Sequence, residues 1–395
     1  MRIVQINSVC RGSTGKIARM INDHLDQNND EGYTLFSVGE PVDMDHEFCC
    51  SNSSEVKKNA LQSRIKGNYG FNSEKATERY INKLEELKPD IVHVHNIHGH
   101  DLNLETFFRY LEEKGIPVVI TMHDCWLFTG YCPHYQSVSC DHFMNGCGPC
   151  PVYRQYSWFK DSSKENLERK KNVLLSLPDL TIVTPSQWLK DEVKKSVLKE
   201  CSVEVIHNGI DLGSYHQSDS NVNDEKQRLI LSVAFPFTEK KGFSDLMRIA
   251  GNLSEGYRMV LVGISEEQKK NLPQNVTGIL KTDSIEELVK LYNDADVLVS
   301  ASHEENFPTV NLEAQACGLP VAAYDVGGTR ETFNQNTGIA VKDGDVEALL
   351  SACMHLAEKK RNISGECRKF AEDNADSQKM AESYRKLYHR ILEKK

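Results

Sequence analysis

Short apolar runs alternate with amphipathic segments along nearly the whole chain, and this alternation constrains the fold more than any other feature. Runs rich in Val, Ile and Leu are typical of strands whose two faces are both covered, as in parallel sheets. The segments between them carry apolar residues at helical spacing, such as Ile17, Ile21 and Leu25. The pattern predicts an α/β fold with helices on both faces of parallel sheets. The predicted strands are residues 3–9, 34–38, 91–95, 118–122, 180–184 and 203–206, then 229–234, 259–262, 276–281, 297–300 and 321–324.

The length of the chain indicates two domains. A single hydrophobic core rarely extends beyond about 250–300 residues, and this chain has 395. The pattern is interrupted at the polar residues 212–226, which we interpret as an interdomain linker. We therefore predict a first domain over 1–211 and a second, doubly wound domain over 227–376. The final segment, 377–395, is predicted to be an amphipathic helix.

Composition and charge argue against some classes of function. The formal net charge is −10, whereas a general nucleic-acid binder needs a basic surface. No apolar run reaches the roughly 20 residues that span a bilayer, and the chain begins directly with a strand pattern rather than a signal peptide. We expect a cytoplasmic protein. The basic segment 55–69 is interpreted as a solvated face, with contact to an anionic acceptor or to the inner membrane surface as the alternative.

One stretch, 301–331, gathers features expected of a ligand site. It follows the buried strand 297–300, and Pro308 and Gly318 mark the start and the end of a helix. The amide groups at a helix start lack intrahelical partners and carry the positive end of the helix dipole. This helix start is therefore suited to a phosphate.

Two carboxylates and a glycine pair accompany this helix. Glu305 lies just before the helix and Glu313 lies inside it, so the second carboxylate lies about one turn deeper. After the next strand, Gly327 and Gly328 form a loop that has no side chains to block a ligand. A surface helix with an acidic residue near its start is the structural alternative, and it accounts for Glu305 alone.

Three further loops lie where α/β proteins bind ligands, outside the carboxyl ends of strands. The loop 11–15 contains glycine and joins the first strand to the first helix, a common phosphate-binding position. His123 and Asp124 follow the strand 118–122, and Asn96 and His98 follow the strand 91–95. A metal site built from the histidines of that last strand is disfavoured, because no carboxylate or cysteine shares their spacing. We interpret Asn96 and His98 as polar groups that face substrate.

Taken together and in order, the motifs resemble those of a known family. The stretches EENFPTVNLEAQACGLPV and GGTRE, with TMHDCW, TPSQWLKD, HNGID and KKG, are similar to retaining GT-B glycosyltransferases with an E-x7-E motif, glycosyltransferase family 4, group 1. HDCW and the cysteine-rich segment look like those of bacterial capsule and colanic-acid enzymes. The resemblance covers nearly the whole chain. It implies two Rossmann-like domains that face a central cleft, with the last helix crossing back to the first domain.

The resemblance also implies a reaction. A sugar would pass from a UDP- or GDP-sugar to a saccharide or polyprenyl-linked acceptor in surface polysaccharide biosynthesis, with retention and without a catalytic metal. Catalytic roles fall to His123 as a hydrogen-bond partner of a sugar hydroxyl or phosphate, to Glu305 on sugar hydroxyls, and to Lys241 on the diphosphate. Donor contacts are expected from Thr14, Gly15, Lys240, Lys281, Thr282, Asn306, Phe307, Pro308, Thr309 and Glu313, the last on the ribose. Acceptor contacts are expected from Asn96, His98 and Asp124, and Asp124 is also expected to orient His123.

The chain departs from the family at one position. Family members usually carry an arginine shortly after the strand that here is 229–234, where this chain has Phe235 and Pro236. We take Lys240 as the substitute charge. The aspartate pairs 294/296 and 343/345 superficially resemble metal-binding carboxylates, but helix ends and caps account for both.

Other functions stay open at this point. A nucleotide-sugar epimerase of similar fold lacks the E-x7-E arrangement, and a phosphorylase needs a pyridoxal-binding lysine in a much longer chain. A non-catalytic sensor or scaffold that binds sugar nucleotides is the alternative of a different class. Release of free nucleoside diphosphate without acceptor would distinguish an enzyme from a sensor.

Five cysteines fall between residues 125 and 150. The last two form a C-x2-C, the usual spacing of a zinc chelate. They lie in the long loop 129–154, which has no periodic pattern and needs something to hold it in order. We predict one structural zinc, and the alternative is a loop with several free, partly buried thiols. The predicted ligands are Cys132, Cys140, Cys147 and Cys150, with His134, His142 and Cys125 as alternatives for one of them.

Overall fold

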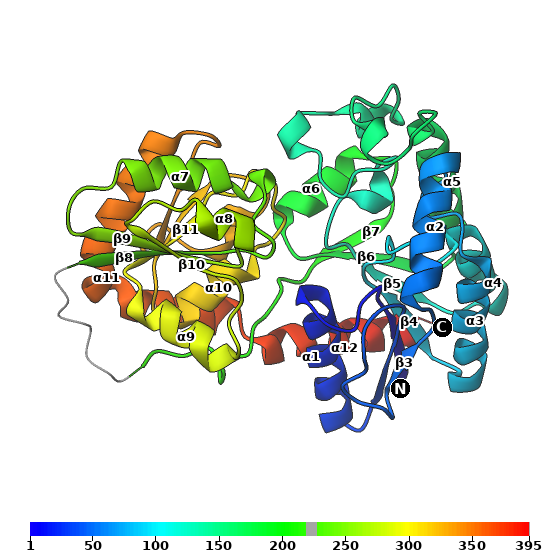
Figure 1. Ribbon diagram of the computed structural model, residues 1–395. Coiled ribbons are helices and arrows are strands. Elements are labelled where there is room, and N and C mark those ends of the chain that lie inside the picture. Colours follow the sequence, from blue (N-terminus) through cyan, green and yellow to red (C-terminus); the bar gives the residue numbers. More distant parts are fainter. Residues whose placement is uncertain (219–226, 395) are drawn as a thin grey trace. The chain divides into compact units, whose positions relative to one another are not determined.

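The computed structural model describes residues 1–218 and 227–394, and the chain divides into two units (Figure 1). Unit 1 comprises Met1–His207 and Gln378–Lys395, and unit 2 comprises Asn208–Ser377. The division lies close to the predicted boundaries. The predicted linker 212–226 differs, because Tyr215 is buried in the core of unit 2, where its ring packs near Tyr292. Residues 219–226 of that linker lie outside the described residues.

Unit 1 is built on one parallel sheet of seven strands in the order β3-β2-β1-β4-β5-β6-β7. The order changes direction between β1 and β4, and the carboxyl ends of the strands at such a switch point are where open α/β sheets bind ligands. The short β3 has no apolar run and was not predicted. The strands are β1 Arg2–Ile6, β2 Glu31–Phe36, β3 Glu47–Cys49, β4 Ile91–Val94, β5 Val118–Thr121, β6 Leu180–Thr184 and β7 Ser202–Val205.

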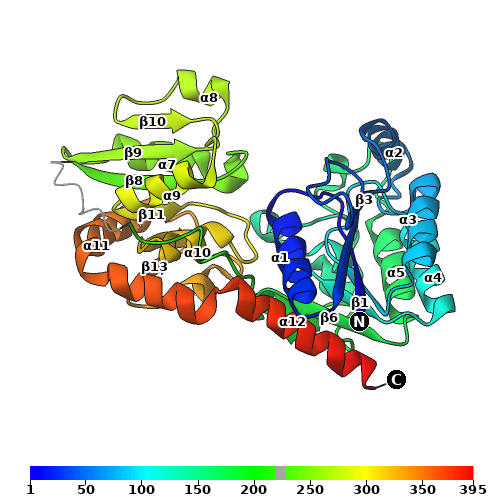
Figure 2. The ribbon, with the colours of Figure 1, turned by 90° about the horizontal axis from the view of Figure 1, so that it is seen from below.

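Alternate strand residues of unit 1 face two separate cores, as the period of two requires. One core joins residues such as Val4 and Val92 to helices α3 (Glu74–Leu87), α4 (Leu104–Lys114), α5 (Ser163–Leu175) and α6 (Gln187–Lys195). The other joins Ile3 and Ile91 to α1 (Ser13–Gln27) and α12 (Ser377–Leu392). The last helix therefore packs on unit 1 beside α1, as the resemblance implied (Figure 2).

Two segments of unit 1 lie outside this layered core. Helix α2 (Ser53–Lys66) buries only Ser63 and is capped by the side chain of Asn52, so it is a solvated helix. The long connection from β5 to α5 contains only short 3-10 turns, at Trp126–Phe128, Gln136–Val138, His142–Asn145 and Tyr153–Gln155. None of the described helices combines the length and apolarity that a bilayer span requires.

Unit 2 repeats the architecture with six parallel strands in the order β10-β9-β8-β11-β12-β13. Its switch point lies between β8 and β11. The last strand was not predicted, because its glycine and alanine weaken the β signal. The strands are β8 Arg228–Val233, β9 Tyr257–Val262, β10 Val276–Ile279, β11 Val297–Ser300, β12 Val321–Tyr324 and β13 Gly338–Val341.

Both faces of the second sheet are covered too. Leu229 and Leu231 pack with α9 (Ile285–Asp294) and α10 (Thr309–Ala316), whereas Ile230 packs with α7 (Phe243–Gly251) and α11 (Val346–Asn374). Figure 1 shows α7 on one side of this sheet and α9 and α10 on the other. A short helix, α8 (Glu266–Lys270), follows β9. The prediction of helices on both faces of parallel sheets is confirmed for both units.

Candidate functional site

Two lysine–glutamate pairs lie at the carboxyl ends of the central strands of unit 2. The Lys240 ammonium donates to both carboxylate oxygens of Glu304, at 3.0 and 2.8 Å. The Lys241 ammonium donates to Oε1 of Glu305 at 2.5 Å. Only 5% of the Glu304 side chain is exposed. The structure therefore brings Lys241 and Glu305 together, as two catalytic candidates, and adds a buried carboxylate that sequence reasoning missed.

Gly242 explains how the two lysines reach this position. Its φ is 73°, and a Cβ atom there would lie 2.0 Å from the carbonyl oxygen of Ala301. The turn that carries the lysines thus packs directly on the end of β11. The amide of His303 donates to the carbonyl oxygen of Lys240 at 2.9 Å. This bond fixes the turn against residues 301–308, which we call the acidic loop.

The glycine pair after β12 also holds the acidic loop. Gly327 has a φ of 60°, and a Cβ atom there would lie 2.0 Å from the carbonyl oxygen of Glu305. The amide of Gly328 donates to the carbonyl oxygen of Asn306 at 2.8 Å. We expected these glycines to leave space for a ligand. Their close backbone contact with residues 305 and 306 gives a second reason for glycine at these positions, because this contact fixes where the backbone of the acidic loop lies.

Helix α10 begins at Thr309, one residue later than predicted, because Pro308 occupies the N-cap position. Proline offers no side-chain acceptor to the first-turn amides, and the first turn contains no acidic residue. The side chains of Asn306 and Phe307 are buried, so these two residues would meet a ligand through the backbone. Anion binding at this helix start stays a prediction.

Glu313 lies deeper on α10 and is half-buried. The hydroxyl of Tyr292 donates to its Oε2 at 2.8 Å. Burial, and then the Glu313 carboxylate, raise the pKa of Tyr292 and of Tyr215. Two tyrosines that the sequence did not connect to Glu313 therefore orient its carboxylate.

The remaining donor candidates of unit 2 lie at other strand ends. Lys281 and Thr282 are in the loop between β10 and Ser284, the N-cap of α9. Phe235 follows β8 at the position where the family usually has arginine, and it is 80% exposed. Because Lys240 is paired with a buried carboxylate, its charge is already balanced within the protein. The substitution of Lys240 for that arginine stays a prediction.

In unit 1, the loop after β1 has the form expected for a phosphate. A Cβ atom on Gly15 would lie 2.5 Å from the carbonyl oxygen of Cys10, so only glycine fits there. The Asn7 amide donates to Thr14 Oγ1 at 3.0 Å. Gly12 occupies the N-cap of α1 and offers no side-chain acceptor, and the first turn contains no acidic residue. The amides at this helix start can therefore serve an anion.

His123 is half-buried after β5, and its Nε2 lies 2.9 Å from Nδ1 of His95. Burial lowers the pKa of His123 to about 4, so its ring is neutral at physiological pH. His93 lies on β4 and His95 directly follows that strand, with ring centroids 4.1 Å apart. His95 and Gln5, which the sequence did not connect to the site, are thus linked to His123 by hydrogen bonds. A glutamine inside an apolar strand was the available signal for Gln5.

Asp124 pairs with His98 rather than with His123. His98 Nε2 lies 2.8 Å from Oδ2 of Asp124, and the amide of Trp126 donates to Oδ1 at 2.8 Å. Burial acts to raise the pKa of Asp124, but the charge and hydrogen bond of His98 outweigh it and bring the pKa to about 2. Asn96 is held through its backbone, whose amide donates to Oδ1 of Asn7 at 3.2 Å. Asn96 and His98, the two predicted acceptor-side residues, thus both lie just after the carboxyl end of β4.

The four predicted zinc ligands line one small cavity of about 20 Å³ with His142; they are Cys132, Cys140, Cys147 and Cys150. Cys132 and Cys150 are hydrogen-bonded to each other. Within residues 1–218 and 227–394, no group of three or more His, Cys, Asp or Glu residues has the arrangement of a metal site. The zinc site stays a prediction.

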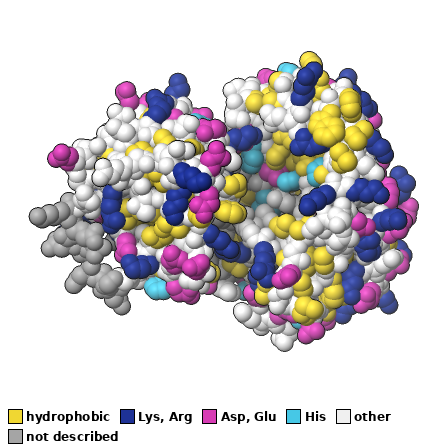
Figure 3. All heavy atoms as spheres, viewed as in Figure 1, with side chains coloured by type: hydrophobic (Ala, Val, Ile, Leu, Met, Phe, Trp, Pro, Cys, Tyr) yellow, Lys and Arg dark blue, Asp and Glu magenta, His cyan; other side chains and the backbone are white. Residues whose placement is uncertain are grey.

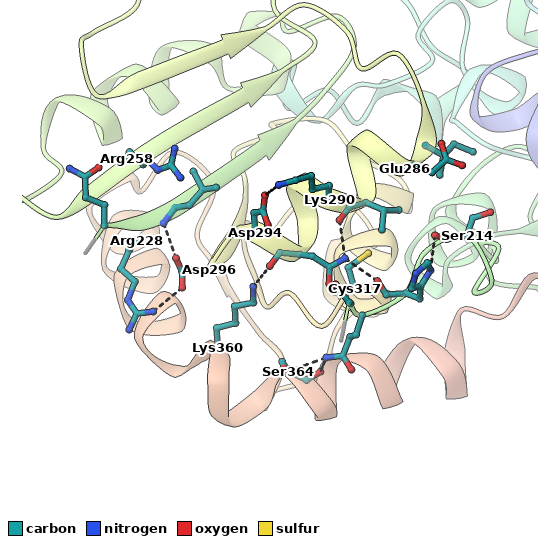
Figure 4. A pocket seen from close by; sticks show the side chains of 18 of the residues that line it. Ser214, Arg228, Arg258, Glu286, Lys290, Asp294, Asp296, Cys317, Lys360 and Ser364 are labelled. Atoms are coloured by element: carbon teal, nitrogen blue, oxygen red, sulfur yellow. Dashed lines mark hydrogen bonds and ion pairs between the residues drawn. The ribbon is translucent and has the colours of Figure 1, made fainter. Parts of the chain in front are cut away.

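A much larger cavity, of about 950 Å³, lies elsewhere in unit 2 (Figure 4). Arg228, at the first residue of β8, donates to Asp296, which immediately precedes β11, at 2.8 Å. The Lys360 ammonium donates to the carbonyl oxygen of Asn293 at 2.6 Å. The cavity thus lies at the amino ends of the strands, opposite the edge where such sheets bind ligands. We do not assign it to the candidate site.

Two family models match the chain, one in each half. Residues 63–214 match the model described as Glycosyltransferase Family 4, and residues 216–376 match the model described as Glycosyl transferases group 1.

Two of the curated relatives are named for bacterial polysaccharide biosynthesis. The chain is 24% identical over 272 residues to the putative colanic acid biosynthesis glycosyl transferase WcaC of Escherichia coli, covering 66% of each chain. It is 28% identical over 236 residues to the capsular polysaccharide biosynthesis glycosyltransferase CapM of Staphylococcus aureus, covering 53% of this chain and 62% of the relative. The chain thus spans slightly less than two thirds of the length of these two relatives.

Solved structures share the fold over the full length. Sucrose-phosphate synthase from Thermosynechococcus elongatus superposes with a TM-score of 0.76 at 17% identity, covering 100% of both chains. HepE from Anabaena in complex with UDP-glucose superposes with a TM-score of 0.69 at 14% identity, covering 99% of this chain and 100% of that one. At this identity the likeness establishes the fold.

Proposed function

Since the chain belongs to the group 1, family 4 glycosyltransferases, we propose that it transfers a sugar from a nucleotide-sugar donor to a saccharide or polyprenyl-linked acceptor, with retention of anomeric configuration. The names of its relatives favour surface polysaccharide biosynthesis as the setting. The observation that carries the proposal is the Lys241–Glu305 pair beside the start of α10, at the carboxyl ends of β8 and β11.

This edge of unit 2 supplies what a nucleoside diphosphate needs. A departing diphosphate develops negative charge, and preorganised donors stabilise that charge best. Lys241 supplies a positive charge, and the first-turn amides of α10 supply hydrogen-bond donors. Glu305 then accepts from sugar hydroxyls and Glu313 from the ribose. With Lys241 and these amides as the groups that stabilise the diphosphate, the proposed chemistry uses no metal ion.

The donor is proposed to be a UDP- or GDP-sugar. HepE, which shares the fold, is seen with UDP-glucose. A panel of UDP-, GDP- and ADP-sugars tested by thermal shift identifies the donor, because a ligand at 100 times its dissociation constant adds roughly 2.7 kcal/mol of stability. Release of free nucleoside diphosphate from the selected donor then tests catalysis. Binding without any release, with or without acceptors, would instead favour the sensor.

Contact with an anionic membrane surface is a second part of the proposal. Leu61, Ile65, Trp158 and Phe159 are exposed, and the amide of Trp158 donates to the carbonyl oxygen of Arg64, which ties the two segments together. Lys57, Lys58 and Lys66 are exposed on the same helix. Figure 3 shows hydrophobic side chains next to Lys and Arg on the visible face of unit 1. Such a patch suits anionic lipid headgroups and the upper acyl region.

Vesicle sedimentation tests this contact. We expect binding to vesicles that contain phosphatidylglycerol, weaker binding at high salt, and little binding to neutral vesicles. The double variant Trp158→Ser, Phe159→Ser should lose binding while donor hydrolysis in solution stays unchanged. Equal binding of the variant would exclude this patch.

A further inference from the structure

A line of buried hydrogen bonds in unit 1 ends at His123. Gln5 on β1 donates through Nε2 to the carbonyl oxygen of Ala18 at 2.6 Å and to Oδ1 of Asn22 at 2.5 Å. Oε1 of Gln5 lies 2.7 Å from Nε2 of His95, and Nδ1 of His95 lies 2.9 Å from Nε2 of His123. Gln5 and His95 are both buried. The line runs from β1 past the carboxyl ends of β4 and β5, and these three strands are adjacent in the sheet.

The chemistry of this line fixes the position of each proton. A backbone carbonyl can only accept, so the end of Gln5 that faces Ala18 must be the amide nitrogen. The other end, which faces His95, is then the carbonyl oxygen, so His95 Nε2 must carry a proton. A neutral imidazole with a proton on Nε2 accepts at Nδ1. His123 must therefore donate from its own Nε2.

The surroundings keep His95 neutral, as this assignment requires. Its ring packs on His93, which is held by Thr121 Oγ1 at 2.8 Å and by the hydroxyl of Tyr388 at 2.7 Å. Burial is the main cause that lowers the pKa of His95 well below its usual value, and the neighbouring histidines add to it. No charged partner is needed to satisfy the ring, because both of its nitrogens already have neutral ones.

We propose that His95 is a positioning residue which, set by Gln5, holds His123 in the tautomer with the proton on Nε2. While the ring is neutral, Nδ1 of His123 is then an acceptor. On the proposed function, His123 accepts a hydrogen bond from a hydroxyl of the donor sugar and does not donate one to its phosphate. The second half of this statement rests on the proposed function, whereas the tautomer does not.

Nitrogen-15 NMR of histidine-labelled protein tests the tautomer directly. Two-bond proton–nitrogen correlations distinguish the two neutral forms, and a His123→Asn variant assigns the signal of His123. We expect His123 and His95 both in the form protonated on Nε2 at pH 7. His123 protonated on Nδ1 in the wild-type protein would overturn the proposal.

Matched variants test the positioning. In His95→Asn, Oδ1 takes about the place of Nδ1 and keeps an acceptor for His123. His95→Leu removes that acceptor at similar volume. We expect the His123 signals to keep their tautomer in the asparagine variant and to show a mixture in the leucine variant. His93→Asn, a buried change on the same strand outside the line, should leave the tautomer of His123 unchanged.

Donor hydrolysis supplies the functional readout. A neutral hydrogen bond is worth about 0.5–1.5 kcal/mol, so His95→Leu should lower kcat/KM by about two- to tenfold. His95→Asn should restore most of it. An unchanged His123 tautomer in His95→Leu would refute the positioning role. If the wild-type protein hydrolyses no nucleotide sugar, the proposed function fails, and the proposed contact between His123 and a sugar hydroxyl fails too. The NMR result still decides the tautomer.

Discussion

Glu304 and Glu305 are adjacent in the sequence but differ in environment. Glu304 is buried and uses both oxygens to accept from Lys240, whereas Glu305 accepts from Lys241 through Oε1 and is more exposed. The first pair therefore fixes the acidic loop against the lysine turn. The second pair is placed to exchange partners when a phosphate and sugar hydroxyls arrive, since both groups keep contact with solvent.

Removal of Lys241 or Glu313 should abolish transfer without unfolding the protein. Lys241→Ala removes the charge proposed to stabilise the leaving diphosphate, and losing one such donor costs about 10²–10³ in rate. Glu313→Ala removes the proposed ribose contact. Nucleoside diphosphate release and the melting temperature measure the two effects. Lys359→Ala, an exposed lysine on α11, is the control, and near-normal turnover in either site variant would contradict the assignment.

Gly327→Ala should disturb the site through the backbone. The new Cβ atom would lie 2.0 Å from the carbonyl oxygen of Glu305, so the acidic loop must move and donor hydrolysis should fall at least about tenfold. Gly344→Ala is the matched control, because Gly344 also has a positive φ but meets no atom within 4 Å. Both variants should lose about 1–2 kcal/mol from the left-handed conformation. Equal activity in the two would show that the contact is unimportant.

The Asp124–His98 pair should make the stability of unit 1 depend on pH. Burial lowers the pKa of His98, but Asp124 more than offsets this and raises it above its usual 6.5. A raised histidine pKa stabilises the fold fully below the unfolded value and is lost as pH rises through the folded value. The stability difference between wild type and Asp124→Asn, from urea unfolding, should therefore shrink as pH rises above 6.5. A constant difference between pH 6 and 9 would contradict the ion pair.

At the scale of elements, the apolar pattern predicted the bounds of the central strands better than it predicted the edge strands beside them. The strands 180–184, 297–300 and 321–324 were predicted to the residue, because apolar runs are local signals. β3 was missed because it has no apolar run, and β13 because its glycine and alanine weaken the β signal. Residues 212–218 were predicted as part of a linker because Leu212 and Tyr215 are the two apolar residues of a polar segment.

The candidate site shows the same limit. The E-x7-E motif and the resemblance located Glu305, Glu313 and Lys241. The partners that hold site residues, such as Tyr292 for Glu313 and His95 for His123, come from other strands and helices. No spacing in the sequence encodes such contacts, since only the sheet order brings these residues together.

The cysteine loop between β5 and α5 should bind about one zinc per chain. Its four thiols surround one cavity of about 20 Å³, and thiolates gathered at a C-x2-C are typical zinc ligands. Cys147→Ser and Cys150→Ser should lose the metal and lower the stability of unit 1, whereas Cys49→Ser, an exposed cysteine, should do neither. Metal analysis of untagged protein decides the question. Absence of zinc, with all four thiols titratable in the native state, would refute the site.

At the scale of the whole molecule, the proposed chemistry and the proposed zinc make different demands on a chelator. The charges at the donor edge of unit 2 come from Lys241 and helix α10, so brief treatment with EDTA should leave transfer unchanged. Loss of unit 1 stability on prolonged treatment would fit a structural metal. A complete loss of transfer that Mg²⁺ or Mn²⁺ reverses, without unfolding, would show that the aspartate pairs have a catalytic role.

The return of the chain to unit 1 also determines when unit 1 can finish folding during synthesis. Unit 1 needs α12, whose Tyr384 and Tyr388 complete one of its cores, yet all of unit 2 leaves the ribosome first. At synthesis rates of about 5–20 residues per second, unit 1 waits roughly 10–30 s with one face of its sheet covered only by α1. A message truncated before codon 378 would yield a complete unit 2 and a unit 1 exposed to chaperones and proteases.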